Sequence, residues 1–186
     1  MCGIDMLPQT KILLLNQQLE PKWWTGKTIW ISGATGSWGR EFCYQLLQLP
    51  ITKLIAYCRG EHRAHDLETR LSDTRVRIHL GDIRDSERLR ESFAVLPDVV
   101  IHTAALKRID SAGYNPYEFI STNVLGTWNI VQAILYANCN HTVQKAFYVS
   151  SDKAFQSETF YGTTKDRKST RLNSSHLKLS RMPSSA

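Results

Sequence analysis

Short apolar runs alternate with stretches of helical periodicity from Thr28 onward. The runs are rich in β-branched and aromatic residues and carry few charges, which is typical of buried strands. In most of the segments between them, apolar side chains recur every three or four positions, as on one face of a helix. The pattern predicts five strands, at Thr28–Ser32, Lys53–Cys58, Arg75–Leu80, Val99–His102 and Ala146–Ser150.

The segments between the runs predict helices. One follows the first strand, and the charged segment Glu61–Leu71 predicts another. Asp85 is placed to cap a third helix that runs through Phe93. Asn115, followed by a proline in the first turn and by Glu118, predicts the capped start of a long helix. Tyr161 is expected to begin a last one.

Strands that alternate with helices at this spacing predict an α/β fold, in which helices cover both faces of a doubly wound parallel sheet. No internal repeat interrupts the alternation. After the fifth strand and the start of the last helix, no apolar run predicts a sixth strand. We therefore expect one sheet that is truncated after strand five.

A glycine-rich turn lies between the first strand and its helix. Gly33, Gly36 and Gly39 have the G-x-x-G-x-x-G spacing that lets a chain turn tightly, approach a pyrophosphate and pack a helix closely on a strand. Amides at the helix start then face the phosphates. The turn predicts a Rossmann-like dinucleotide site with contacts at Gly33, Thr35, Gly36, Ser37, Trp38 and Gly39. The alternative is a plain glycine-rich turn.

Two arginines follow the second strand, where an acidic residue would bind the ribose hydroxyls of NAD. Arg59 stands at that position, and Arg63 comes one helical turn later. A guanidinium suits the 2′-phosphate of NADP, so the sequence favours NADP over NAD. The alternative is that both arginines are solvated surface residues.

Candidate catalytic residues follow the fifth strand, at the sheet edge where open α/β folds bind ligands. Asp152 and Lys153 come directly after the strand, and Tyr161 and Lys165 are four residues apart on one helix face. An ammonium near a phenol favours the phenolate and lowers its pKa, which makes tyrosine a usable base. For Asp152 and Lys153, an exposed polar turn is the alternative.

Seven segments occur in a characteristic order: SGATGSWG, YCRGE, GDIRD, HTAALK, YNPYEFISTNVLGT, SSDKA and YGTTK. Together they resemble the extended short-chain dehydrogenase/reductase superfamily. Within it, the resemblance is closest to inverting UDP-N-acetylglucosamine 4,6-dehydratases and related polysaccharide-biosynthesis proteins, over roughly residues 27–165. Asp152-Lys153-Ala154 is the most discriminating segment, because the retaining nucleotide-sugar dehydratases carry Asp-Glu there.

The resemblance implies a redox-neutral dehydration of a UDP-sugar. Tyr161, helped by Lys165, would deprotonate the 4-hydroxyl while carbon 4 passes hydride to NADP⁺. Lys153 would remove the proton on carbon 5 and Asp152 would protonate the departing 6-hydroxyl, after which the hydride returns to carbon 6. A base and an acid side by side need environments that separate their pKa values.

The resemblance also implies binding roles. Asp82 and Ile83 would meet the adenine, and Ala104 and Ala105 would let the cofactor pass over the fourth strand. Lys107 would lie near nicotinamide and sugar. Asn123 and Ser151 would support the substrate site, although a buried amide satisfied by backbone is an equal reading of Asn123. A full-length relative continues into a smaller sugar-binding region and is expected to form a homo-oligomer.

Four positions at three places depart from the pattern of these relatives: Gly60 replaces an aspartate, Ile109-Asp110 replaces Val-Pro, and Gly113 replaces a glutamate. They leave the exact sugar open. A nucleotide-sugar 4-epimerase is the near alternative, and an inactive nucleotide-binding fragment is an alternative from another class. His62, His65 and Asp66 are interpreted as a polar helix face, so no metal site is predicted.

Composition is that of an ordinary globular protein, with 42% hydrophobic and 22% charged residues. Four separated cysteines without a C-x-x-C pair favour a reducing cytoplasm. The first 26 residues show no sustained period and form a leader of uncertain order. They contain no run long enough for a membrane span, and we expect neither a membrane nor a nucleic acid partner.

Residues 166–186 hold most of the net charge of +6: five basic residues and one acidic residue leave only +2 for the rest of the chain. The segment has six serines and neither helical nor strand periodicity, as in a disordered basic arm. We instead expect DRKSTRLNSSH and SRMPSSA to be a translated sequencing adapter. The charge then says little about partners.

Overall fold

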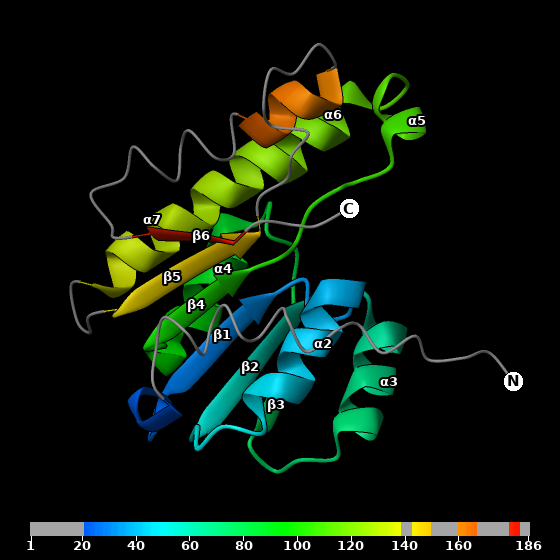
Figure 1. Cartoon of the computed structure of the whole chain (residues 1–186). Helices are drawn as coiled ribbons and strands as arrows, with labels where there is room; N and C mark the ends of the chain where they lie inside the picture. The colour runs from blue at the N-terminus through cyan, green and yellow to red at the C-terminus, as the bar shows by residue number, and fades with distance from the viewer. Residues whose placement is uncertain (1–20, 139–142, 150–159, 167–178, 183–186) are drawn as a thin grey trace, which may run out of the picture.

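The computed structural model of the chain describes residues 21–138, 143–149, 160–166 and 179–182. Within these residues six parallel strands form one sheet in the order β3-β2-β1-β4-β5-β6 (Figure 1). The strands are β1 (Thr28–Ser32), β2 (Lys53–Cys58), β3 (Val76–Leu80), β4 (Val99–His102), β5 (Lys145–Val149) and β6 (Leu179–Met182). The doubly wound α/β fold predicted from the sequence is confirmed.

Helices cover both faces of the sheet (Figure 1). On one face lie α2 and α3, and on the other lie α4 and α7. The helices are α2 (Ser37–Leu46), α3 (Glu61–Leu71), α4 (Ser86–Ser92), α5 (Ile109–Ala112), α6 (Pro116–Phe119) and α7 (Thr127–Ala137), with residues 160–166 also helical. Two 3₁₀ turns, η1 (Pro21–Trp24) and η2 (Phe93–Val95), and a π-helical segment, η3 (Ile120–Gly126), complete the described elements.

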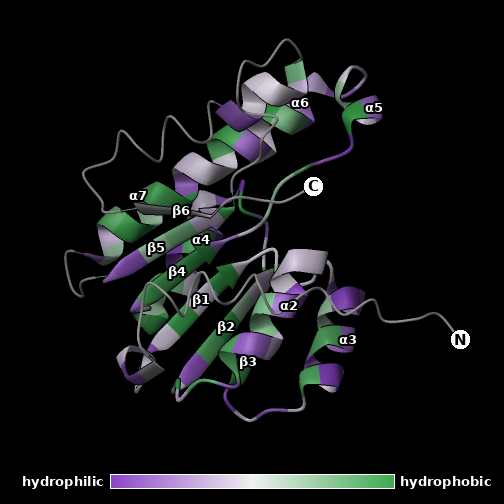
Figure 2. Ribbon diagram, in the orientation of Figure 1, coloured by the Kyte–Doolittle hydropathy of each residue, from purple (hydrophilic) through white to green (hydrophobic). Residues whose placement is uncertain are grey.

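The alternation of side chains along the strands divides the interior into two cores. Ile29 and Ile31 of β1 pack toward α2 and α3, whereas Trp30 packs toward α4 and α7. The Trp30 ring lies 5.1 Å from the Tyr57 ring and 4.8 Å from the Phe93 ring. The central strands are accordingly apolar on both faces, which Figure 2 shows as green along the middle of the sheet.

Helix starts agree with the sequence in one case and differ in another. The Asp85 carboxylate accepts hydrogen bonds from the amides of Glu87 and Arg88, so the predicted cap of α4 is confirmed. The predicted side-chain cap at Asn115 is wrong. Both its backbone N–H and its side-chain Nδ2 donate to the Ser111 carbonyl, which turns the side chain back toward α5.

The far edge of the sheet also differs from the prediction. The sheet does not end at strand five, because Leu179–Met182 pairs with β5 as a sixth parallel strand, with Ala146 opposite Leu179. An edge strand offers a row of unpaired N–H and C=O groups, and any extended segment can pair with it. The sixth strand therefore depends on this pairing rather than on its own composition.

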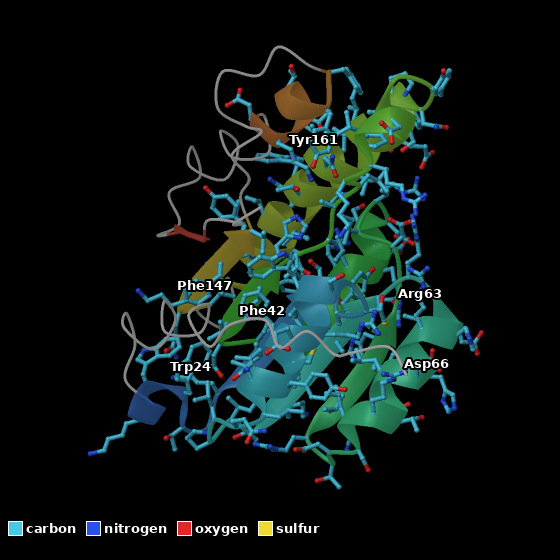
Figure 3. The ribbon with its side chains drawn as sticks, turned by 45° about the vertical axis from the view of Figure 1, so that its right-hand side comes forward. Trp24, Phe42, Arg63, Asp66, Phe147 and Tyr161 are labelled. Atoms are coloured by element: carbon cyan, nitrogen blue, oxygen red, sulfur yellow. The ribbon has the colours of Figure 1, made fainter. Side chains whose placement is uncertain are left out.

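The end of the predicted leader belongs to the folded body. Trp24 in η1 is fully buried and packs in the core beneath α2, near Phe42 and Phe147 (Figure 3). Its ring meets the Trp23 ring edge to face at 5.0 Å. This short turn closes the amino end of β1.

Candidate active site

A cavity of about 640 Å³ lies at the carboxyl ends of β1, β2 and β4. The chain proceeds from β1 toward β3 on one side and from β4 toward β6 on the other, so the cavity lies where the strand order reverses. Open α/β sheets bind ligands at this point. The lining includes the predicted cofactor residues Gly33, Thr35, Gly36, Ser37, Trp38, Gly39, Arg59, Arg63, Asp82, Ile83, Ala104, Ala105 and Lys107.

The glycine turn forms one wall of the cavity. Gly33 has a φ of +69°, and a Cβ there would lie 2.7 Å from the Ala104 amide nitrogen. A Cβ on Gly39 would overlap the Gly33 carbonyl oxygen and lie 2.7 Å from the Ala34 Cα. Gly36 caps α2 without a side-chain acceptor. The turn is thus shaped for a close backbone approach, and the first turn of α2 suits an anion.

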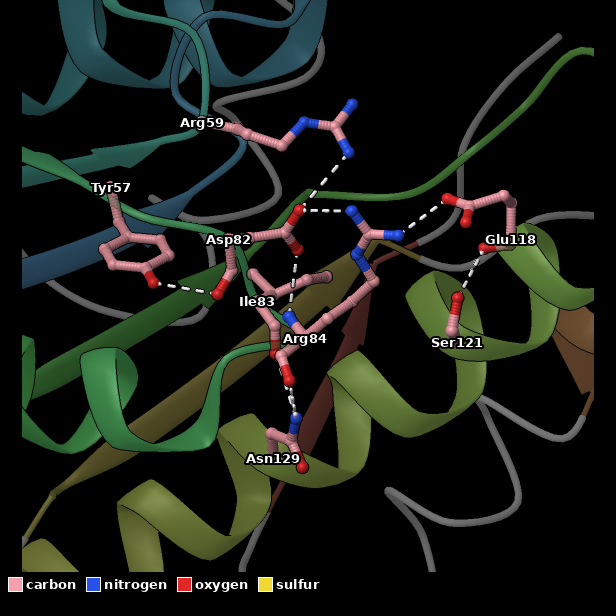
Figure 4. A network of polar contacts seen from close by, with 8 residues as sticks. All are labelled: Tyr57, Arg59, Asp82, Ile83, Arg84, Glu118, Ser121 and Asn129. Atoms are coloured by element: carbon pink, nitrogen blue, oxygen red, sulfur yellow. Dashed lines mark hydrogen bonds and ion pairs between the residues drawn. The ribbon is translucent and has the colours of Figure 1, made fainter.

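The second wall carries charge (Figure 4). Arg59, His62 and Arg63 line it together with Asp82. Asp82 Oδ2 lies 3.3 Å from Arg59 Nη1 and 2.8 Å from Arg84 Nη2. Burial raises the pKa of the Asp82 carboxyl, but the hydrogen bonds from Arg84 outweigh burial and hold it below its usual range. The carboxylate is therefore ionised and held in place.

The third wall is the segment after β4, and it contains a residue that the sequence did not reveal. Thr122 lines the cavity beside Ala104–Lys107 and is only 6% exposed. Its Oγ1 is buried and has no hydrogen-bond partner among the described residues. A buried hydroxyl at a cavity wall is suited to a ligand, because an unpaired polar atom is otherwise costly.

A buried chain of hydrogen bonds runs from this wall to η3 and the start of α7. The Ala104 amide donates to Ser32 Oγ (3.4 Å), which lies 2.7 Å from His102 Nδ1. His102 Nε2 lies 3.0 Å from Thr127 Oγ1, which donates to the Asn123 carbonyl at 2.7 Å. Since the Thr127 proton is used, Nε2 must be the donor in this contact, so His102 carries a proton on Nε2.

Asn123 links the cavity wall to the helix at residues 160–166. Its Oδ1 accepts from the Leu106 amide at 2.9 Å, and its Nδ2 donates to the Leu106 carbonyl and to Thr164 Oγ1, both at 3.2 Å. The side chain is fully buried, so it does not contact solvent. The prediction that backbone groups satisfy the Asn123 amide is therefore correct for the two bonds to Leu106, whereas the third bond goes to the Thr164 side chain.

Tyr161 and Lys165 lie on that helix and are both buried. Lys165 Nζ lies 5.3 Å from the centre of the Tyr161 ring, so the two side chains share one face of this helix, as their spacing predicts. Burial lowers the Lys165 pKa from its usual value to about 8. Figure 3 shows Tyr161 on a part of the molecule distant from Arg63, and neither Tyr161 nor Lys165 is among the described residues that line the cavity. Ser151, Asp152 and Lys153 lie outside the described residues.

Residues 29–180 match a family described as polysaccharide biosynthesis protein. The chain belongs to this family. The match includes the glycine turn, the cavity wall after β4 and the helix that carries Tyr161 and Lys165. It also runs into the segment that the sequence predicts to be adapter, up to residue 180.

Curated relatives of this family member include two kinds of enzyme. The chain is 37% identical over 141 residues to a UDP-N-acetylglucosamine 4,6-dehydratase (inverting) of Campylobacter jejuni, which covers 75% of this chain and 41% of that protein. It is 33% identical over 132 residues to a UDP-glucose 4-epimerase of Rickettsia felis, which covers 69% of this chain and 37% of that protein. The chain thus spans about two fifths of the length of these relatives.

The fold of the family member is shared with a solved dehydratase. A dTDP-glucose 4,6-dehydratase from Streptomyces venezuelae with NAD and TYD bound superposes with a TM-score of 0.71 at 22% identity. The superposition covers 84% of this chain and 55% of that one. At this identity the likeness describes the fold alone.

The described part of the chain was searched for clusters of metal-ligating side chains and for helices that could span a membrane. Across residues 21–138, 143–149, 160–166 and 179–182, no three His, Cys, Asp or Glu side chains are grouped as metal ligands would be. Among the same residues, no helix combines the length and apolar character that a bilayer crossing requires.

Proposed function

We propose that the chain is the nucleotide-binding part of a UDP-N-acetylglucosamine 4,6-dehydratase. The observation that carries the proposal is the cavity at the point where strand order reverses, because it gathers the glycine turn, Arg59, Asp82 and the residues after β4. The identity to the Campylobacter dehydratase supports the substrate class. The reaction would supply a sugar precursor for polysaccharide synthesis.

The cofactor of the proposed enzyme is NADP. A dinucleotide suits the cavity, because the glycine turn lines it at the start of α2 and is packed so tightly on its own backbone that Gly33 and Gly39 admit no Cβ. Thr122 adds a buried hydroxyl without a partner among the described residues. Arg59 and Arg63 on the second wall favour a 2′-phosphate. When bound, the nicotinamide supplies a reversible hydride acceptor.

Tyr161 is the proposed base for the 4-hydroxyl of the sugar. Lys165 lies over its ring, and a nearby ammonium favours the phenolate. Because burial lowers the Lys165 pKa to about 8, the ammonium is sensitive to pH in the range where the phenolate is needed. Asp152 and Lys153 are the proposed acid and base for the elimination, on the basis of their sequence position after β5.

The near alternative is a nucleotide-sugar 4-epimerase, which the identity to the Rickettsia epimerase favours. Both reactions use the same tyrosine, and they differ in whether water is lost. Asp152 and Lys153 are the residues that distinguish the two, since only elimination needs a second acid and base.

Product analysis tests the proposal. The protein, expressed from its native gene, is incubated with UDP-N-acetylglucosamine, and the products are separated and identified by mass spectrometry and NMR. We expect a 4-keto-6-deoxy sugar and its loss in Tyr161→Phe, with turnover reduced at least about a hundredfold. A 4-epimer as the sole product would contradict dehydration, and unchanged turnover in Tyr161→Phe would contradict the role of the tyrosine.

The enzyme is further proposed to act in the cytoplasm as a homo-oligomer. The four separated cysteines support a reducing compartment. Exposed apolar side chains along the long helix, at Tyr117, Leu125 and Tyr136, support a contact surface. Light scattering on the native protein measures the oligomeric state directly, and a monomer at micromolar concentration would contradict this part.

A further inference from the structure

The Asp82 carboxylate contacts two arginines, Arg59 and Arg84, and the two contacts differ in strength (Figure 4). Arg84 holds both oxygens: its backbone N–H donates to Oδ1 at 2.9 Å and its Nη2 to Oδ2 at 2.8 Å. Arg59 reaches only Oδ2, at 3.3 Å, and its side chain is 61% exposed. The acid is therefore satisfied mainly by Arg84, and the contact with Arg59 is the looser one.

The two arginines differ in their position relative to the cavity. Arg59 lines it, whereas Arg84 does not, and the other Arg84 nitrogen, Nη1, pairs with Glu118 Oε2 of α6 at 2.6 Å. The charges around this end of the cavity are Arg59, Arg63 and Asp82 on its wall, with Glu61 next in sequence. An additional anion at this end competes with Asp82 for Arg59.

We propose that Arg84 sets the preference for NADP over NAD without touching the cofactor, by occupying Asp82 and so leaving Arg59 for the 2′-phosphate. The inference rests on the proposed function, in which Arg59 faces that phosphate. Arg84 is a positioning residue, and the specificity-determining contact is made by Arg59.

Removing the Arg84 side chain changes how the two remaining charges, Asp82 and Arg59, act on a bound phosphate. Asp82 loses its stronger partner, so its pairing with Arg59 tightens, and its charge repels a nearby phosphate. NAD carries no 2′-phosphate and is indifferent to both effects. We expect Arg84→Gln to weaken NADPH relative to NADH by about tenfold, the scale of losing one hydrogen bond to a charged group.

The loop that carries Asp82 has anchors that survive this substitution. Asn129 Nδ2 of α7 donates to the carbonyls of Ile83 at 3.1 Å and Arg84 at 3.0 Å, and the Tyr57 hydroxyl donates to the Asp82 carbonyl at 3.0 Å. None of these bonds uses the Arg84 side chain. The loop is therefore expected to keep its place, so a change in the cofactor ratio reports charge.

The test is a fluorescence titration of the 186-residue chain with NADPH and with NADH, in which the ratio of the two dissociation constants is measured. Four variants are compared with the wild type: Arg84→Gln, Asp82→Asn, the double variant and Arg77→Gln. Arg77 is a matched control, because it is not among the described residues that line the cavity and its guanidinium donates to the carbonyls of Thr74 and Val76. The ratio cancels any effect of Asp82 on adenine binding, which both cofactors share.

We expect Arg84→Gln to shift the ratio about tenfold toward NADH, and Asp82→Asn in the same chain to restore it to within about twofold of Asp82→Asn alone. Arg77→Gln should change the ratio by less than about twofold. Equal weakening of NADPH and NADH in Arg84→Gln, or a double variant that stays shifted, would overturn the inference. A wild type that prefers NADH would contradict the NADP part of the proposed function, while the shift caused by Arg84→Gln still decides the inference. A wild type that binds neither would overturn both.

Discussion

Replacing Thr127 with valine tests the buried chain of hydrogen bonds beneath the cavity. Valine is β-branched like threonine and close to it in shape, so the substitution replaces the hydroxyl with a methyl group and removes its hydrogen bonds. The His102 Nε2–H then loses the acceptor that lies 3.0 Å away. The loss of one buried hydrogen bond costs about 0.5–1.5 kcal/mol, so Thr127→Val should lower the free energy of unfolding by this amount.

The structure also predicts where the His102 proton is. Because Thr127 Oγ1 donates to the Asn123 carbonyl, the ring must donate from Nε2. Nitrogen NMR of the imidazole distinguishes the two tautomers, and we expect the Nε2–H form in the wild type and a changed signal in Thr127→Val. Urea unfolding of the same samples gives the loss of stability.

Thr127→Ser is the matched control. It keeps the hydroxyl and removes one methyl group, which costs roughly 1 kcal/mol. Its His102 signal should match the wild type even though its stability falls. An Nδ1–H tautomer in the wild type, or a His102 signal that is identical in the valine and serine variants, would refute the reasoning.

Three further predictions follow from other parts of the chain. Gly39→Ala should weaken NADPH binding by at least about tenfold, because its Cβ would overlap the turn. Gly113→Ala, which has open space around its Cβ and does not line the cavity, should change binding less than about twofold in the same titration. Lys165→Met should stabilise the chain at pH 7 by up to about 3 kcal/mol, because the Lys165 pKa of about 8 in the folded chain lies below the unfolded value of ~10.4. The cost of burying the ammonium is fully present below about pH 8, so the gain from removing it should fade as the pH rises from about 8 to ~10.4. A gain that is independent of pH would contradict this prediction. Sequencing genomic DNA across the Lys165 codon should show a different continuation, and a genomic reading frame through SRMPSSA would refute the adapter interpretation.

The strands and the cavity were predictable because their signals are local. Three strands, Thr28–Ser32, Lys53–Cys58 and Val99–His102, have the predicted bounds, since apolar runs between turns leave little choice of period. The glycine turn and Arg59 both line the cavity, as the sequence predicted. Each follows directly after a strand, and in this fold the strand ends mark where a ligand binds.

The residues that escaped prediction depend on contacts between distant segments. The π-helical segment Ile120–Gly126 interrupts a helix that looks continuous in sequence. Thr122, which lines the cavity from this segment, was not predicted. Asn123 was expected from the resemblance, but its bonds to Leu106 and Thr164 were not. Such segments often occur at functional sites, and nothing in local periodicity marks them.

The prediction that the sheet ends after strand five and the prediction of a side-chain cap at Asn115 were wrong for the same physical reason. Leu179–Met182 pairs because β5 offers an edge, and Asn115 bonds to Ser111 because α5 precedes it closely. In both cases a neighbouring backbone group decides the outcome over intrinsic propensity.

The central claim is that the cavity at the carboxyl ends of β1, β2 and β4 holds a nicotinamide dinucleotide. A two-dimensional amide NMR titration of the chain with NADP⁺ tests it most directly. We predict saturable shifts at Gly36, Ser37, Arg59, Asp82 and Ala104, with little change on β3 at Arg77. Shifts confined to residues outside the cavity, or none at millimolar NADP⁺ in a folded sample, would contradict the account.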